Sequence, residues 1–154
     1  MERGIMGHSY RNAPEHIVFS TKHRRPVIRP EFRLRLYEYM AGVARKEFGM
    51  ALKIGGTENH IHGLLQVMPE VSLAEALRKW KCLSSKWVHE VLRVKDFAWQ
   101  IGYASIGVSP DRIKAVTNYI TNQERHHHRR TFEEEFTSIL TKAGIPFDPR
   151  HVFD

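Results

Sequence analysis

The order of strand-like and helix-like segments restricts the possible folds of this chain more than any other sequence feature. Short apolar segments typical of strands lie at residues 16–20, around Leu52 and Ile54, at 60–67 and at 104–108. Helical patterns start at Pro30, after Ser72 and at Pro110. The order strand, helix, strand, strand, helix, strand, then helix predicts an α+β fold. We expect a ferredoxin-like β-α-β-β-α-β two-layer sandwich with an added C-terminal helix.

The composition favours a partner that carries negative charge. The chain has 154 residues, which predicts one domain over 1–154, and its formal net charge is +7. This excess favours nucleic acid first, without deciding between DNA, RNA and a membrane surface. A single cysteine excludes an internal disulfide, and no apolar run is long enough to span a bilayer. Because the first four residues lead into no hydrophobic signal core, we expect a cytoplasmic protein.

Two histidines are two residues apart on the third predicted strand. Side chains alternate along a strand, so His60 and His62 share one face, while Ile61 and Leu65 point into the core. This spacing suits a metal clamp, since neutral imidazole is a common ligand. The pattern alone equally fits two surface histidines on a half-exposed strand, and for a bare His-x-His that interpretation is preferred.

The helix after Pro110 carries a tyrosine and a glutamine four residues apart. Tyr119 and Gln123 are neighbours at the edge of the apolar stripe formed by Ile113, Val116 and Ile120. An edge position allows both side chains to face a cleft. For an isolated tyrosine the usual interpretation is structural, with a packed ring and a hydrated hydroxyl.

The histidine pair and the tyrosine helix together suggest one catalytic site. Gln123 would add a carbonyl oxygen to the imidazole nitrogens of His60 and His62, a mixed set that suits Mg2+ or Mn2+. Three ligands leave room for a phosphate oxygen and water. Tyr119 would then attack a phosphodiester in line and form a 5′-phosphotyrosine link.

Several segments in order resemble the single-tyrosine HUH transposases, especially the REP-associated tyrosine transposases. The resemblance runs from about Tyr10 to the C-terminus. It rests on residues 16–22 (His-Ile-Val-Phe-Ser-Thr-Lys), 55–62 (Gly-Gly-Thr-Glu-Asn-His-Ile-His), 84–87 (Ser-Ser-Lys-Trp), 98–103 (Ala-Trp-Gln-Ile-Gly-Tyr), and 119–127 (Tyr-Ile-Thr-Asn-Gln-Glu-Arg-His-His).

The resemblance implies a role for each matching residue. His60 and His62 match the HUH pair, Tyr119 the nucleophile and Gln123 the third metal ligand. It also implies a homodimer, in which one subunit's tyrosine helix can complete its neighbour's site. The implied substrate is single-stranded DNA with hairpin ends, which is cut and rejoined. The chain departs from the usual pattern at Gly63, where a bulky aliphatic is common.

Basic residues on two segments are candidates for phosphate contacts. Lys22, Arg24 and Arg25 follow the first strand, and Arg78, Lys79 and Lys86 lie on the second long helix. Such contacts provide salt-dependent affinity without sequence specificity, and a solvated helix face is about as good an explanation for each residue. Among the tryptophans, Trp80 and Trp87 have core spacing, and Trp99 in a loop-like stretch is the more open candidate for base stacking.

Two charged runs follow the tyrosine helix. Adjacent helical residues point in different directions, so the histidines at 126–128 cannot form one metal clamp. We interpret residues 126–130 as a basic helix end that complements the helix dipole and contacts DNA. The acidic residues 133–135 are expected to form a solvated face of a last short helix.

Three functions are compatible with these observations. The first is a metal-dependent single-strand DNA transposase. The second is a non-catalytic or domesticated protein that binds DNA or RNA hairpins, which would not need His60, His62, Tyr119 and Gln123 together. The third is an RNA-directed nuclease, which shares the same charge.

Overall fold

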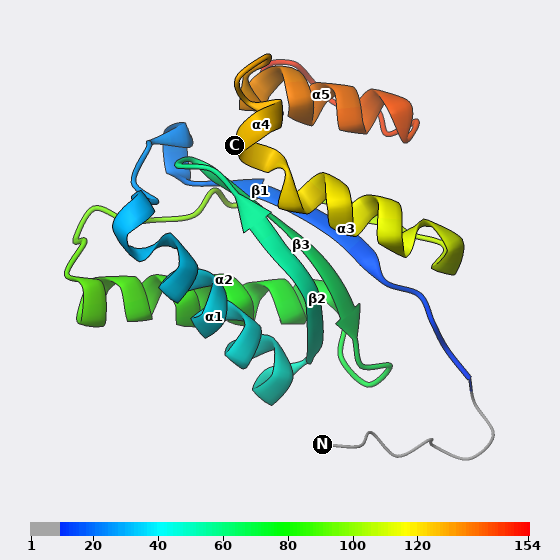
Figure 1. Cartoon of the computed structure of the whole chain (residues 1–154), viewed down its shortest axis with the longest axis horizontal. Coiled ribbons are helices and arrows are strands. Elements are labelled where there is room, and N and C mark those ends of the chain that lie inside the picture. Colours follow the sequence, from blue (N-terminus) through cyan, green and yellow to red (C-terminus); the bar gives the residue numbers. More distant parts are fainter. Residues whose placement is uncertain (1–9) are drawn as a thin grey trace.

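The computed structural model describes residues 10–154 and shows the predicted element order (Figure 1). The predictions made for the first four residues lie outside this range. The helices and strands are β1 (Glu15–Ser20), α1 (Pro30–Glu47), β2 (Gly49–Gly56), β3 (His60–Val67), α2 (Leu73–Trp87), β4 (Ala104–Gly107), α3 (Ile113–Thr121), α4 (Gln123–His126) and α5 (Phe132–Lys142). Short turns of helix occur at η1 (Lys22–Arg24), η2 (Val88–Leu92) and η3 (Pro110–Arg112).

The four strands form one antiparallel sheet in the order β2-β3-β1-β4. The two central strands are therefore the first and the third, which confirms the ferredoxin-like arrangement. Helices α1 and α2 cover one face of the sheet, as the two-layer prediction requires. The predicted tyrosine helix and last short helix are both present, and α3, α4 and α5 together form a further layer on the other face (Figure 1).

The main core lies between the sheet and the helices α1 and α2. Trp80 is fully buried there, and its indole N–H donates to the Met40 carbonyl at 2.8 Å. Trp99, which the sequence left undecided as a candidate for base stacking, is buried in the same cluster. Its ring meets Phe19 edge-on at 5.0 Å, and its indole N–H donates to Ser84 Oγ. An indole buried with its N–H paired contributes to packing and is not available for base stacking.

Two smaller apolar clusters hold the added helices on the other face. One joins Ile120 of α3 to Leu64 of β3 and to Val108. The other joins α5 to β1 and β4, and its buried members are Val18, Ala104, Phe132, Phe136 and Leu140. Because strand side chains alternate, the β3 residues that face these helices are the even-numbered ones, starting with His60 and His62.

No helix within residues 10–154 is long and apolar enough to cross a membrane. The predicted start of α2 after Ser72 is confirmed, since the Ser72 hydroxyl accepts from the backbone N–H of Glu75 at 3.1 Å.

Candidate active site

The structure brings His60, His62, Tyr119 and Gln123 of a single chain into one cluster. Both histidines lie on the face of β3 covered by the added helices, and both are fully buried. Gln123 Oε1 lies 3.0 Å from His60 Nε2. The Tyr119 ring lies edge-on to that of His62, with 5.8 Å between centroids. The alternation along the strand predicted that His60 and His62 share a face, and the helical spacing predicted that Tyr119 and Gln123 are neighbours. The structure places both pairs in the same cluster.

A break in the tyrosine helix turns Gln123 inward. The sequence predicted one continuous helix, but α3 ends at Thr121 and α4 starts at Gln123. The intervening Asn122 has φ −98° and ψ 23°, and its side chain donates to the Asn118 carbonyl at 2.9 Å. An asparagine side chain that bonds to the backbone competes with regular helix geometry. Gln123 follows this break and is 1% exposed.

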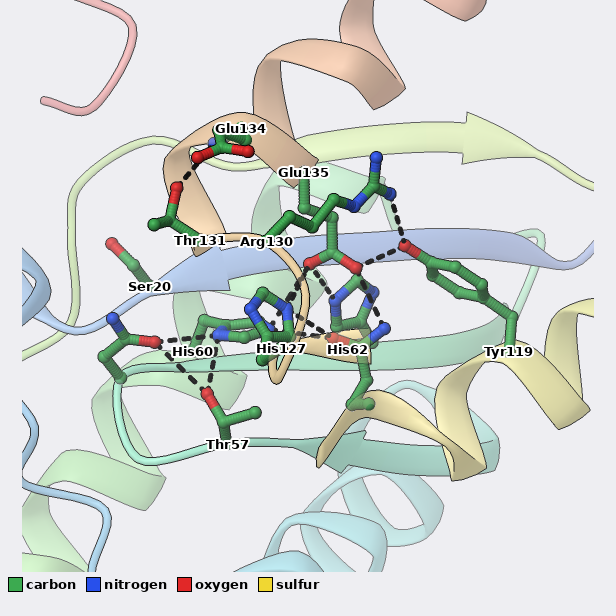
Figure 2. Close-up of polar contacts among 12 residues, drawn as sticks. Ser20, Thr57, His60, His62, Tyr119, His127, Arg130, Thr131, Glu134 and Glu135 are labelled. Atoms are coloured by element: carbon green, nitrogen blue, oxygen red, sulfur yellow. Dashed lines mark hydrogen bonds and ion pairs between the residues drawn. The ribbon is translucent and has the colours of Figure 1, made fainter. Parts of the chain in front are cut away.

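A fully buried carboxylate in the cluster was missed from the sequence. Glu135 of α5 is fully buried, which corrects the prediction of a solvated face for residues 133–135. Its Oε1 lies 3.1 Å from His62 Nε2, and its Oε2 accepts from the Tyr119 hydroxyl and from the Gln123 amide. Figure 2 shows His62 and Tyr119 directed at the carboxylate.

Helical spacing explains why Glu135 is buried and its neighbour Glu134 is exposed. Residues three and four apart share a helix face, so Glu135 lies in the stripe that contains Phe132, Phe136 and Ile139. The position of Glu135 within this apolar stripe was the sequence signal that could have identified it as a buried residue. The acidic run as a whole concealed this signal.

One member of the histidine run also belongs to the site. His127 Nε2 lies 3.0 Å from Glu135 Oε1 and 3.1 Å from Gln123 Oε1, so residues 126–130 are more than a basic helix end. His126 instead stacks on the Tyr119 ring at 4.7 Å between centroids. The expectation that consecutive histidines point in different directions is confirmed.

Further side chains orient the two β3 histidines. His16 lies on β1, where the residue opposite His62 is Val18, and its Nε2 reaches diagonally to within 2.8 Å of His62 Nδ1. On His60 the corresponding nitrogen, Nδ1, is 3.0 Å from Thr57 Oγ1 and 2.9 Å from Asn59 Oδ1. With each Nδ1 held in this way, both Nε2 atoms face the cluster, as in metal-binding histidines whose other nitrogen is hydrogen-bonded.

Burial sets the charge state of the site. It lowers the pKa of His62 to about 3 and that of His16 to about 4, so both imidazoles are neutral at physiological pH. Burial would raise the pKa of Glu135, but hydrogen bonds from His127, His60 and His62 hold it well below its usual range. Burial, and then the hydrogen bond to Glu135, raises the pKa of Tyr119 to about 12.

The donor set of this cluster fits a divalent cation. One ligand atom each from His60, His62 and Glu135 lies within 4.8 Å of the others. The Gln123 amide oxygen lies 3.0 Å from His60 Nε2, beside this group. Imidazole nitrogen with carboxylate and amide oxygen is a set that accepts Mn2+ or Mg2+. The cluster could therefore hold a metal ion of this class.

The predicted phosphate-binding residues separate into two groups. Lys22 and Arg25 are exposed on the loop after β1, while Arg24 pairs with Glu133 at 2.8 Å. This loop lies beside the start of β3, since the Thr21 N–H donates to the Asn59 carbonyl. Next to it is a surface hollow of 460 Å³, lined by residues 57–59 and 127–134. The loop therefore borders the same end of the molecule as the active-site histidines.

The second group lies across the sheet from the site. Arg78, Lys79 and Lys86 belong to α2, which packs on the opposite face from His60 and His62. Lys79 is close to Glu47 and Glu75, at 3.8 and 3.7 Å, while Arg78 and Lys86 are exposed. None of these three side chains can contact DNA that binds only on the face of the sheet that carries His60 and His62.

The family model described as "Transposase IS200 like" matches residues 9–123 of the chain. Its match includes His60, His62, Tyr119 and Gln123 and stops before Glu135. No curated protein sequence matches the chain significantly.

Two solved structures share the fold. A candidate transposase from Deinococcus radiodurans R1 is 20% identical with a TM-score of 0.59, over 80% of this chain and 98% of that one. A REP-associated tyrosine transposase bound to a REP hairpin is 14% identical with a TM-score of 0.58, over 77% of this chain and 73% of that one.

Proposed function

Because the chain belongs to the IS200-like transposase family, we propose that it cleaves and rejoins single-stranded DNA through a 5′-phosphotyrosine intermediate. One observation carries this proposal. The Tyr119 hydroxyl and the Nε2 atoms of His60 and His62 converge on one small buried cluster within a single chain. A hairpin-binding module would have no need of this convergence.

In the proposed reaction Tyr119 is the nucleophile. Its oxygen attacks the phosphorus of a phosphodiester, the bond to the 3′ oxygen breaks, and the 5′ phosphate remains on the tyrosine. The phenol proton passes to solvent, since Tyr119 is partly exposed, and the leaving 3′ oxygen becomes a hydroxyl. A later attack by a 3′ hydroxyl reverses these bond changes and rejoins the strands. A divalent metal held by His60, His62 and Gln123 would polarise the phosphate.

The approach of the phosphate is restricted by burial. His60, His62 and Gln123 have almost no exposed surface, whereas Tyr119 and Arg130 are partly exposed. Arg130 Nη2 lies 3.4 Å from the Tyr119 hydroxyl. Figure 2 shows the guanidinium directed at this hydroxyl. A guanidinium suits a phosphate oxygen, so we propose that the DNA enters from this side and contacts Arg130.

We propose single-stranded DNA with hairpin ends as the substrate, on the family resemblance and on the hairpin bound in the similar transposase. A homodimer is expected on the same resemblance. The partner's tyrosine is not required to complete the site, because one chain supplies all four residues. Light scattering on the purified protein would report the oligomeric state.

A covalent-adduct assay tests the proposal. Hairpin oligonucleotides labelled at the 3′ end are incubated with protein and Mn2+, then separated on a denaturing gel. Wild type should retain the label, and Tyr119→Phe should bind the DNA without retaining it. If no hairpin gives an adduct with Mn2+ present, the protein is a binding module. Competition with RNA hairpins at fixed salt separates DNA from RNA specificity.

A further inference from the structure

Glu135 is held in the site by the packing of α5. The Thr131 hydroxyl caps the helix by accepting from the Glu134 N–H at 3.2 Å. Phe132 and Phe136, on either side of Glu135 along the buried stripe, pack against the β1 and β4 face of the sheet. The Glu135 carboxylate is thus fixed at full burial, and rotation to solvent would require α5 to move.

A buried carboxylate is unfavourable unless hydrogen-bonded and balanced by positive charge. Within residues 10–154, every basic side chain within 4.0 Å of the Glu135 carboxylate is a histidine: His127 at 3.0 Å, His62 at 3.1 Å and His60 at 3.5 Å. No lysine or arginine in that part of the chain forms an ion pair with it. Three imidazole Nε2 atoms therefore surround one carboxylate oxygen, Oε1, without a permanent cation.

This arrangement is what a cation site would require. Two imidazoles and an amide are neutral ligands, whereas Mg2+ and Mn2+ favour sites that include at least one carboxylate. Glu135 is the acidic residue that joins His60 and His62 in the cluster of metal-ligating groups found within residues 10–154. It can provide the missing negative charge.

We propose that Glu135 is the anionic ligand of the metal and also positions the nucleophile. Its Oε1, which faces the two β3 histidines, binds the ion, and its Oε2 keeps the hydrogen bonds from the Tyr119 hydroxyl and the Gln123 amide. The inference rests on the metal of the proposed function. It adds to that function a ligand from α5, outside the segment matched by the family model.

Metal binding without DNA tests the ligand role. Mn2+ is titrated into the metal-free full-length protein, and affinity is measured by calorimetry or by the electron paramagnetic resonance signal of free Mn2+. Glu135→Gln keeps the shape but removes the charge, and should weaken binding at least about tenfold. Glu134→Gln, an exposed neighbour, should bind as wild type does, and His62→Ala should lose the site. Circular dichroism of each variant confirms folding.

Equal Mn2+ affinity in wild type and Glu135→Gln overturns the proposal, as does the absence of Mn2+ binding to wild type. A second measurement addresses positioning. At Mn2+ concentrations that saturate Glu135→Gln, the kcat for hairpin cleavage should still fall while KM for DNA stays unchanged. Recovery of wild-type kcat under these conditions would refute the positioning role.

The two proposals can fail separately. If wild type forms an adduct that depends on Tyr119 but Mn2+ affinity is the same in Glu135→Gln, only the inference about Glu135 is refuted. If Mn2+ affinity depends on Glu135 but no hairpin gives an adduct, the proposed nuclease function is refuted and the role of Glu135 as a metal ligand stands.

Discussion

The Tyr119 hydroxyl donates a hydrogen bond to Oε2 of Glu135, while the other oxygen of the same carboxylate lies 3.1 Å from His62 Nε2. One side chain thus connects the proposed nucleophile to the proposed metal ligands. Tyr119 comes from α3, His62 from β3 and Glu135 from α5, so the connection depends on the packing of the added helices on the sheet.

Metal binding should lower the pKa of Tyr119. In the metal-free protein, burial and the bond to Glu135 raise this pKa to about 12. A divalent cation beside the carboxylate offsets its charge and favours the phenolate. The measurement is a tyrosinate absorbance titration of wild type minus Tyr119→Phe, with and without Mn2+. A pKa for Tyr119 that is unchanged or higher with Mn2+ would contradict the arrangement.

The metal-free protein should become less stable on acidification. The pKa of His16 is about 4 in the folded protein, below its ordinary value of 6.5. The contribution of the neutral His16 imidazole to folding stability is therefore fully present above about pH 6.5 and is lost as the pH falls toward 4. The folded-state pKa values of His62 and Glu135 are also lowered, so their titration likewise reduces stability as the pH falls. The loss for His16 alone is roughly 1 to 2 kcal/mol between about pH 7 and about pH 5.

Urea unfolding in the presence of a chelator at both pH values measures this loss. His16→Asn keeps a polar side chain that does not titrate, so its stability should depend less on pH than that of wild type. A wild-type free energy of unfolding that is the same at the two pH values would show that the site histidines are not held neutral by burial.

The sequence predicted those parts of the fold and site that depend on local periodicity. A period of two fixes the faces of β3, which is enough to place His60 and His62 together. Spacing by four brings Tyr119 and Gln123 near each other, even though Asn122 breaks the helix between them. These relationships extend over only a few residues, so they do not depend on how distant segments pack.

Relationships between distant segments could not be predicted in this way. Glu135 is a site residue because α5 packs on β1 and β4, and its contact with His62 joins positions 73 residues apart. His127 contacts Gln123 four residues earlier, but its contact with Glu135 requires the chain to turn between α4 and α5. The sequence left the role of Trp99 undecided, and an isolated bridge to Thr21 fixes its backbone beside β1. Tertiary packing decided all three positions.

The loop after β1 should provide salt-dependent affinity for unpaired DNA. Lys22 and Arg25 are exposed beside the hollow next to the active site. Replacing both with alanine should reduce the slope of log affinity against log salt by about 1.4, since each phosphate contact with a single strand contributes about 0.7. Fluorescence anisotropy with a short unpaired oligonucleotide gives this slope.

Two cations on the opposite layer provide a matched control for that measurement. The double replacement Arg78→Ala and Lys86→Ala removes the same charge from α2, and we expect the slope for a short oligonucleotide to stay at the wild-type value. If the α2 pair lowers the slope and the loop pair does not, the DNA binds across the helical layer and the proposed path past Arg130 is wrong.

Gly63, where the family pattern usually has a bulky aliphatic residue, has a packing explanation in this chain. A Cβ at this position would lie 2.6 Å from Cη2 of Trp80, on the core side of β3. Trp80 cannot easily move, because its indole N–H is bonded to the Met40 carbonyl and its ring packs against Phe19 and Phe48. The tryptophan therefore fills the space that a larger residue 63 would need.

Gly63→Ala should accordingly destabilise the protein by roughly 1 to 3 kcal/mol, the usual cost of overpacking a tight core. Gly107→Ala is the control, since a Cβ there meets nothing within 4 Å, and its effect should stay within about 0.5 kcal/mol. Combining Gly63→Ala with Trp80→Leu should cost less than the sum of the two single changes, because the smaller side chain makes room for the methyl group. Urea unfolding gives all four free energies of this cycle. Strict additivity would show that Gly63 is not constrained by Trp80.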